Sequence, residues 1–109
     1  MPQFDINLNE LVEPPVLDSI SGRAFGISFA ESKNLMAHVR NADRIVLSID
    51  ETQVKAINDS FIKGFFKQVF ELLRSKRRVQ EQFEINANDY YKRLFDKNWT
   101  ILEAIYGTP

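Results

Sequence analysis

The chain has 109 residues and no cysteine, and 14 Lys and Arg stand against 15 Asp and Glu, for a formal net charge of −1. A domain of this length buries a core without disulfides or metal, and the missing thiols exclude cysteine catalysis and thiolate metal sites. The near-neutral charge disfavours nucleic acid as a partner, since phosphate binding needs a surplus of cations. No apolar run approaches the ~20 residues that cross a bilayer, and the first residues do not resemble a signal peptide. We therefore expect a cytoplasmic protein without a membrane partner.

Residues 1–27 are expected to form one strand and an irregular loop. Apolar and polar residues alternate over Gln3–Leu8, which predicts a strand with one buried face. Two consecutive prolines, Pro14 and Pro15, stop any helix that would follow. A short second strand near Val16–Ile20 and a loop with a functional role are both open interpretations.

A helix is expected over about 28–41, because Ser28-Phe29-Ala30-Glu31 has the form of a capping box. In that motif the serine hydroxyl and the glutamate side chain bond to amides at the start of the helix. Asn41-Ala42-Asp43 is typical of a turn. The β-branched run Ile45–Ile49 is too continuous for a half-exposed strand and predicts a central, buried one.

A long helix is expected over about 60–77, with three consecutive N-cap candidates in Asn58-Asp59-Ser60. Its apolar face is wide, and it closes with the basic residues of Arg74–Arg78. Cations are favoured at the negative end of a helix dipole, so this cluster is interpreted as a solvated helix end rather than a nucleic-acid patch.

The sequence of the last part of the chain predicts one strand and one helix. Phe83-Glu84-Ile85 alternates like a short strand, and a helix over about 88–105 is expected to be capped by Asn86 or Asn88. An interruption of that helix near Asn98–Thr100 is an open alternative.

Strands thus alternate with helices through residues 28–109, a pattern typical of a mainly parallel or mixed sheet. We predict a single α/β domain over 1–109, built as a small layer sandwich.

Few residues are suited to catalysis. His38 is the one histidine, and no glycine-rich phosphate loop occurs. The carboxylates of Asp50 and Glu51, with Asp59 nearby in sequence, would need a substrate cleft between them, which a short connection does not offer. We therefore expect no enzyme, cofactor or metal site.

Three features each have both a structural and a functional interpretation. Ser60 is either a helix N-cap or a phosphorylation site, where a dianion would lie at the positive end of the helix with Lys63 one turn away. Gly22-Arg23 is either a turn with a surface arginine or part of an anion-binding loop. The aromatic stripe of the long helix is either core or a partner surface; it consists of Phe61, Phe65, Phe66 and Phe70.

The connection after the central strand also resembles a known superfamily. The residues Ile-Val-Leu-Ser-Ile-Asp of Ile45–Asp50 are followed by Val54, Ile57 and Asn58-Asp59-Ser60-Phe61. This is similar to the STAS superfamily of sulfate-transporter and anti-sigma factor antagonist domains, in which a strand ends in Asp and a Ser-rich loop leads into a helix. The closer resemblance is to bacterial STAS-like domains of unknown function, whose helix opens with Ser-Ser-Phe and an aliphatic residue. Gly22-Arg23 and the Ser28 helix start are similar to the Gly-Arg loop and following helix of that family.

The resemblance covers about residues 22–73 and implies a STAS-like fold. In anti-sigma factor antagonists the serine corresponding to Ser60 is phosphorylated by a kinase-like anti-sigma factor, and the phosphate decides which partner is held. Asp50 corresponds to the aspartate that lies close to that serine. The chain departs from the antagonists at Phe61, where they have a small residue, and at 51–53, where an apolar-Ser-Gly sequence is usual.

The resulting hypothesis is a non-enzymatic regulatory interaction module, switched by phosphate on Ser60, whose partner is a regulatory protein such as an ATPase-type kinase or an anti-sigma-like factor. The residues expected to bind that partner are Asp50, Asn58, Asp59, Phe61, Lys63 and Gly64. The alternative is a small-ligand or nucleotide sensor that binds an anion through Gly22 and Arg23. The sequence leaves open whether the chain forms a homodimer.

Overall fold

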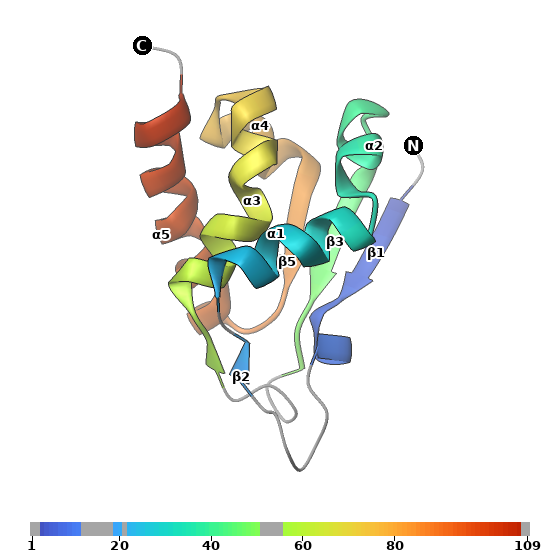
Figure 1. Ribbon diagram of the computed structural model, residues 1–109, viewed down its shortest axis with the longest axis vertical. Coiled ribbons are helices and arrows are strands. Elements are labelled where there is room, and N and C mark those ends of the chain that lie inside the picture. Colours follow the sequence, from blue (N-terminus) through green and yellow to red (C-terminus); the bar gives the residue numbers. More distant parts are fainter. Residues whose placement is uncertain (1–2, 12–18, 21, 51–55, 108–109) are drawn as a thin grey trace.

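In the computed structural model, the structure describes residues 3–11, 19–20, 22–50 and 56–107. Strands and helices alternate along the chain (Figure 1). The elements in order are β1 (Gln3–Asn7), the 3-10 turn η1 (Leu8–Leu11), β2 (Ser19–Ile20), α1 (Arg23–Ser32), α2 (Leu35–Arg40), β3 (Arg44–Ser48), β4 (Ala56–Ile57), α3 (Asp59–Leu73), α4 (Lys76–Gln82), β5 (Phe83–Asn86) and α5 (Asp89–Tyr106).

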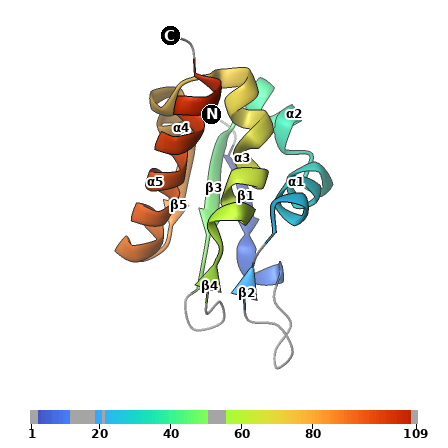
Figure 2. The same ribbon diagram turned by 60° about the vertical axis from the view of Figure 1, so that its left-hand side comes forward.

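The main sheet has three parallel strands in the order β1-β3-β5, so β3 is central. Ile45 and Leu47 of β3 are 0% exposed. A second, two-stranded parallel sheet joins β2 to β4 directly before α1 and α3 (Figure 2). These findings confirm the predicted α/β class, the parallel sheet and the central position of the β-branched run.

The two faces of the main sheet differ in character. Phe4, Ile45 and Phe83 share one register position across the three strands; Ile45 and Phe83 belong to the core that the helices complete, and the partly buried Phe4 packs against it. On the opposite face, the exposed Asp5 and Glu84 flank β3. Over the described residues the domain is therefore one layer of helices on one face of the sheet (Figure 1), and on the other face these two polar residues lie on either side of the buried Val46.

The predicted start of the first helix at Ser28 is wrong. The helix α1 begins at Arg23, after Gly22 with a φ of 103°, and Ser28 is an exposed residue in its interior. A capping box at Ser28 is thus excluded. Close packing on α3, described below, keeps the segment around Gly26 helical although its glycines are typical of a turn.

The expected helix over 28–41 is also divided into two. The helix α1 ends at Ser32, and Asn34 has a left-handed φ of 54°, so α2 starts in a new direction. Asparagine tolerates this conformation better than most residues. The break allows both Leu35 and Val39 of α2 to be buried in the core.

The expected helix over about 60–77 begins as predicted but ends too late. The helix α3 spans Asp59–Leu73 and ends before Arg74, whose φ of 56° is left-handed. Ser75 then caps α4, because its side chain accepts a hydrogen bond from the amide of Arg78. The basic cluster 74–78 therefore lies across a junction between two helices rather than in the last turn of one.

The last helix agrees with the prediction over 88–105. The helix α5 runs without interruption over Asp89–Tyr106, and Asn88 is its N-cap, accepting from the amide of Tyr91 at 3.0 Å. The described part of the expected second strand is Ser19–Ile20, while residues 16–18 and Val54 lie outside the described residues. Among the described helices, none is long and apolar enough to cross a membrane.

The corrected helix boundaries predict different effects of two polar-to-alanine substitutions. Ser28→Ala should change the free energy of unfolding by less than about 0.5 kcal/mol, because the residue is exposed within a helix. Asn58→Ala should lower it by about 1 kcal/mol, because Asn58 caps α3. Urea unfolding measures both values, and a loss of stability in Ser28→Ala that equals the loss in Asn58→Ala would contradict the α1 boundary.

Candidate functional site

The site is built on a close crossing of α1 and α3. A Cβ atom added to Gly26 would collide with the carbonyl oxygen of Phe61, and one added to Gly64 would collide with the carbonyl oxygen of Arg23. Each glycine thus allows the backbone of the other helix to approach. The two helix axes are held so near each other that their first turns meet.

Ser60 lies where these first turns meet. Its Oγ accepts a hydrogen bond from the amide of Gly22 at 3.3 Å and donates one to Oδ1 of Asn58 at 2.7 Å. The Asn58 Oδ1 also accepts from the amide of Ser60 at 2.7 Å, so Asn58 is the N-cap of α3. The N-cap interpretation of Ser60 is therefore wrong: its hydroxyl instead links the beginnings of two helices.

Asp59 connects the first turn of α3 to α5. Its carboxylate accepts from Nδ2 of Asn98 at 2.9 Å and pairs with Nζ of Lys97 at 3.4 Å. The hydrogen bond from Asn98 is the main cause that lowers the pKa of Asp59, and Lys97 and the charge of Lys63 add to it against a smaller effect of burial. Asn98 itself is 0% exposed and also donates to the carbonyl oxygen of Leu94. The first turn of α3 is thus held by α1 on one side and α5 on another.

The aromatic stripe of α3 is core. All four of its phenylalanines are at most 2% exposed, which excludes the stripe as a partner surface. Phe61 and Gly64 are buried, Phe61 against Phe29 of α1 and Gly64 against the backbone of Arg23. Of the residues expected to bind a partner, these two therefore serve packing. The accessible ones are Asp50, Asn58, Asp59 and Lys63.

Phe25 is a surface residue of the site that the sequence analysis did not find. It is 43% exposed on the first turns of α1, and its ring centroid lies 5.8 Å from that of the buried Phe61. Its Cβ lies beside Gly22, whose amide binds Ser60. Recognising a helix start at Arg23 would have placed this aromatic residue on a helix surface instead of in a loop.

Gly22 and Arg23 form the start of α1 rather than an open loop. The amide of Gly22 is used by Ser60, and Nη2 of Arg23 lies 3.5 Å from the hydroxyl of Tyr106 in α5. Anion binding by these residues stays a prediction. Gly22 is in direct contact with Ser60, which lies 38 positions away along the chain, and the sequence did not reveal this contact.

Asp50 follows the end of β3. Its amide donates to Oδ1 of Asn9 at 2.9 Å, and it lines a polar hollow together with Ser48 and Asn86. Asn86 donates to the Ser48 hydroxyl at 3.2 Å across the neighbouring strands. Asp50 thus lies at the carboxyl edge of the main sheet.

His38 has a structural role, because it contacts one carboxylate and one aromatic ring. Its Nδ1 lies 2.7 Å from the carboxylate of Asp43, and its ring stacks on Phe4 with centroids 3.7 Å apart. The hydrogen bond with His38 lowers the pKa of Asp43, assisted by Asn41 and opposed by burial. Within the part of the chain that the structure describes, no three His, Cys, Asp or Glu side chains are grouped so that they could hold a metal ion.

Comparison with known proteins adds no relative to this geometry. No protein-family model, no curated protein and no solved structure matches the chain.

The helix crossing predicts a large effect of one methyl group. Gly64→Ala should lower the free energy of unfolding by about 3 kcal/mol, because the new Cβ meets backbone of α1 that cannot move aside. Glu71→Ala, on the exposed side of the same helix, should cost less than about 0.5 kcal/mol. Denaturant unfolding of both variants checks the difference, and equal stability of Gly64→Ala and the wild type would contradict the crossing.

The lowered pKa of Asp59 predicts a pH dependence. Since the folded pKa lies below that of the unfolded chain, ionised Asp59 stabilises the fold above the unfolded value of about 4, and this contribution is lost as pH falls through the folded pKa. Asp59→Asn should therefore be less stable than the wild type near pH 7, and the gap should close below about pH 4. Unfolding free energies over that pH range test this.

A second substitution assigns the effect to its cause. Asn98→Ala removes the strongest bond to the Asp59 carboxylate, so in that background the stability lost on Asp59→Asn should depend much less on pH. A loss of constant size at every pH in the chain that retains Asn98, or an equally strong pH dependence in both backgrounds, would contradict the assigned role of the carboxylate.

Proposed function

We propose that the chain is a non-enzymatic regulatory module that binds a partner protein through the surface around Ser60. This Ser60 surface consists of Phe25, Asn58, Asp59, Ser60 and Lys63. The observation that carries the proposal is the pair of hydrogen bonds that Ser60 Oγ makes to the beginnings of α1 and α3. A chemical change on one oxygen atom would alter both helix ends at once.

Phosphorylation of Ser60 is the change that suits this position. A phosphate ester oxygen has no proton to donate, so the bond to Asn58 would be lost, and the added charge of about −1.5 to −2 would lie beside Asp59. The positive ends of α1 and α3 and the nearby Lys63 would favour the same dianion. Repulsion from Asp59 and attraction from the helix ends act on the same phosphate and oppose each other, so we expect the local surface to rearrange rather than the fold to be lost.

The surface also carries an anchor for a partner. Phe25 is an exposed aromatic side chain backed by Phe61, and aromatic residues supply much of the binding energy in protein interfaces. The Ser60 hydroxyl donates to an amide oxygen rather than to a general base, which supports binding over catalysis. The resemblance to STAS-like domains makes a kinase-like ATPase or an anti-sigma-like factor the partner class we propose.

The modification and the partner are tested together in the native host. The tagged chain is purified for intact-mass measurement, and the retained partner is identified and then titrated against purified variants. We expect a species heavier by one phosphate that disappears in Ser60→Ala. Binding of the partner should change at least about tenfold in Ser60→Asp and weaken by a similar factor in Phe25→Ser.

Tyr90→Ser is the matched control. Tyr90 is an aromatic residue that is 62% exposed on α5, outside the Ser60 surface, so its loss should leave partner binding within about twofold. Circular dichroism confirms that each variant is folded. The proposal fails if no partner is retained, or if the wild type and the Ser60 and Phe25 variants bind the partner equally and the mass of the chain is unmodified.

A further inference from the structure

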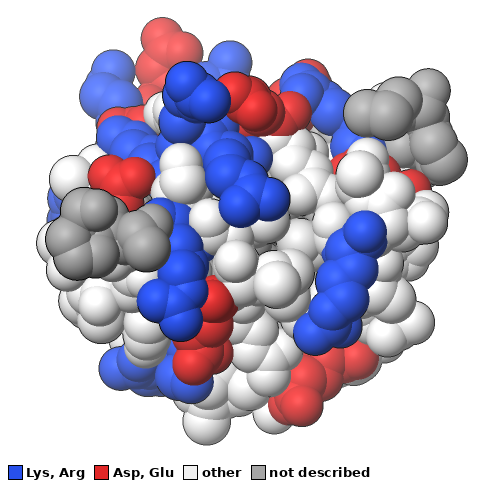
Figure 3. Space-filling view, turned by 90° about the horizontal axis from the view of Figure 1, so that it is seen from above, with Lys and Arg blue, Asp and Glu red and all other residues white. Residues whose placement is uncertain are grey.

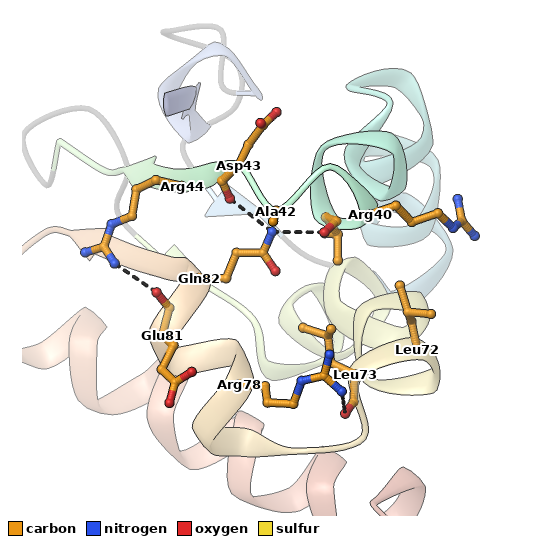
Figure 4. A pocket seen from close by; sticks show the side chains of 10 residues that line it. Arg40, Ala42, Asp43, Arg44, Leu72, Leu73, Arg78, Glu81 and Gln82 are labelled. Atoms are coloured by element: carbon orange, nitrogen blue, oxygen red, sulfur yellow. Dashed lines mark hydrogen bonds between the residues drawn. The ribbon is translucent and has the colours of Figure 1, made fainter. Parts of the chain in front are cut away.

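The end of the molecule far from Ser60 contains a second candidate surface. A hollow of about 520 Å³ lies between the last turns of α2 and α3, the beginning of β3 and α4 (Figure 4). Because α3 begins at Asp59 and reaches the hollow at Leu73, its whole length of 15 residues separates the hollow from the Ser60 surface. The two surfaces share no residue.

The hollow has an apolar lining that is open to solvent. Val39 and Leu73 form its buried part, and Leu72 at its rim is 44% exposed. Leu72 is one of four exposed large hydrophobic side chains among the described residues. An exposed leucine at the mouth of a hollow is suited to contact an apolar side chain of a partner.

Hydrogen bonds hold the polar wall of the hollow in place. Nε2 of Gln82 donates to the carbonyl oxygens of Val39 at 3.1 Å and Asp43 at 3.0 Å, and Nη1 of Arg78 donates to that of Leu73 at 3.3 Å (Figure 4). The Leu73 carbonyl lies at the end of α3 and that of Asp43 in the turn before β3, while the Val39 carbonyl at the end of α2 also accepts from the amide of Ala42. The wall is thus formed before any partner binds, which lowers the entropic cost of binding.

The charge that remains around the hollow is positive. Among the residues the structure describes, Arg40 and Arg78 have no carboxylate partner, whereas Arg44 pairs with Glu84 at 2.7 Å. One of the two acidic residues of the lining is already engaged, because Glu81 pairs with Arg77 at 3.4 Å.

The second acidic group of the lining, Asp43, points away from the hollow in Figure 4 and binds His38 and Asn41. Figure 3 shows Lys and Arg side chains, with Asp and Glu side chains among them, around an uncharged central area on this end of the molecule. A partner would therefore meet free cations at the rim and no free carboxylate among these lining residues.

From this combination we propose that the hollow binds an acidic peptide segment of a partner protein. A bulky apolar side chain of the segment would lie between Val39 and Leu72, and its carboxylates would pair with Arg40 and Arg78. Nucleic acid fits less well, because no aromatic side chain lines the hollow for base stacking and the chain has a net charge of −1. The site does not depend on Ser60 or on its modification.

Selection of a displayed random peptide library for binding to the immobilised full chain tests whether the hollow binds acidic peptides. We expect enrichment of peptides in which Asp or Glu flanks Leu, Phe or Trp. A synthetic copy of the most enriched peptide is then titrated by fluorescence anisotropy. Leu72→Ser and Arg40→Glu should each weaken it at least about tenfold, and added salt should weaken it further.

Two exposed residues of α5 provide matched controls. Ile105→Ser and Arg93→Glu make similar chemical changes outside the hollow and should leave peptide affinity within about twofold. Both hollow variants alter exposed side chains, so we expect them to fold, and circular dichroism checks this.

Three outcomes would overturn the proposal. The first is that no acidic, apolar class of peptide is enriched. The second is that the enriched peptide binds Leu72→Ser and Arg40→Glu as tightly as the wild type. The third is that a single-stranded oligodeoxynucleotide displaces the peptide and its own binding is lost in Arg40→Glu, which would assign the hollow to nucleic acid.

Discussion

The crossing of α1 and α3 is the constraint on which the rest of the site depends. Gly26 and Gly64 each take a place where a methyl group would strike backbone of the other helix, so the two backbones are in direct contact. At that separation the amide of Gly22 reaches the hydroxyl of Ser60, and Phe25 is brought onto Phe61. Larger residues at the crossing would move the helices apart and separate the groups that form the Ser60 surface.

Polar contacts then fix what the crossing brings together. Asn58 binds both the amide and the hydroxyl of Ser60, and Asn98 binds the carboxylate of Asp59 from within the core. A buried amide that orients a carboxylate is sensitive to charge beside it, because neighbouring protein atoms screen less than water does. The first turn of α3 is therefore a place where one added charge has several close partners to act on.

The three strands of the main sheet and the helix α5 were predictable from the sequence, whereas the short strand β4, the start of α1, the breaks between consecutive helices and the helix contacts were not. Alternation and continuous apolar runs depend on which side chains are buried; Gln3–Leu8 has the first signal and Ile45–Ile49 the second, without reference to distant residues. Gly26 is different, since its helical conformation is favoured by packing against Gly64, 38 positions away. Arg74 has a left-handed conformation that no local preference of arginine indicates. The sequence analysis did not find Phe25, because the exposure of this residue depends on the position of α1, the helix that also contains Gly26.

The two proposed surfaces are connected by a helix whose inward face is closely packed. Between Ser60 and Leu72, the inward side chains of α3 include Phe65, Phe66 and Phe70, each at most 2% exposed. A packed helix of this kind moves as one body, and coupling between its ends would need a second arrangement of the core with similar energy. The structure contains aromatic contacts on several sides of Phe66, which oppose such a rearrangement. A charge placed at Ser60 should therefore act on the partner that contacts it, while the hollow at the other end of α3 keeps its shape and its own ligand.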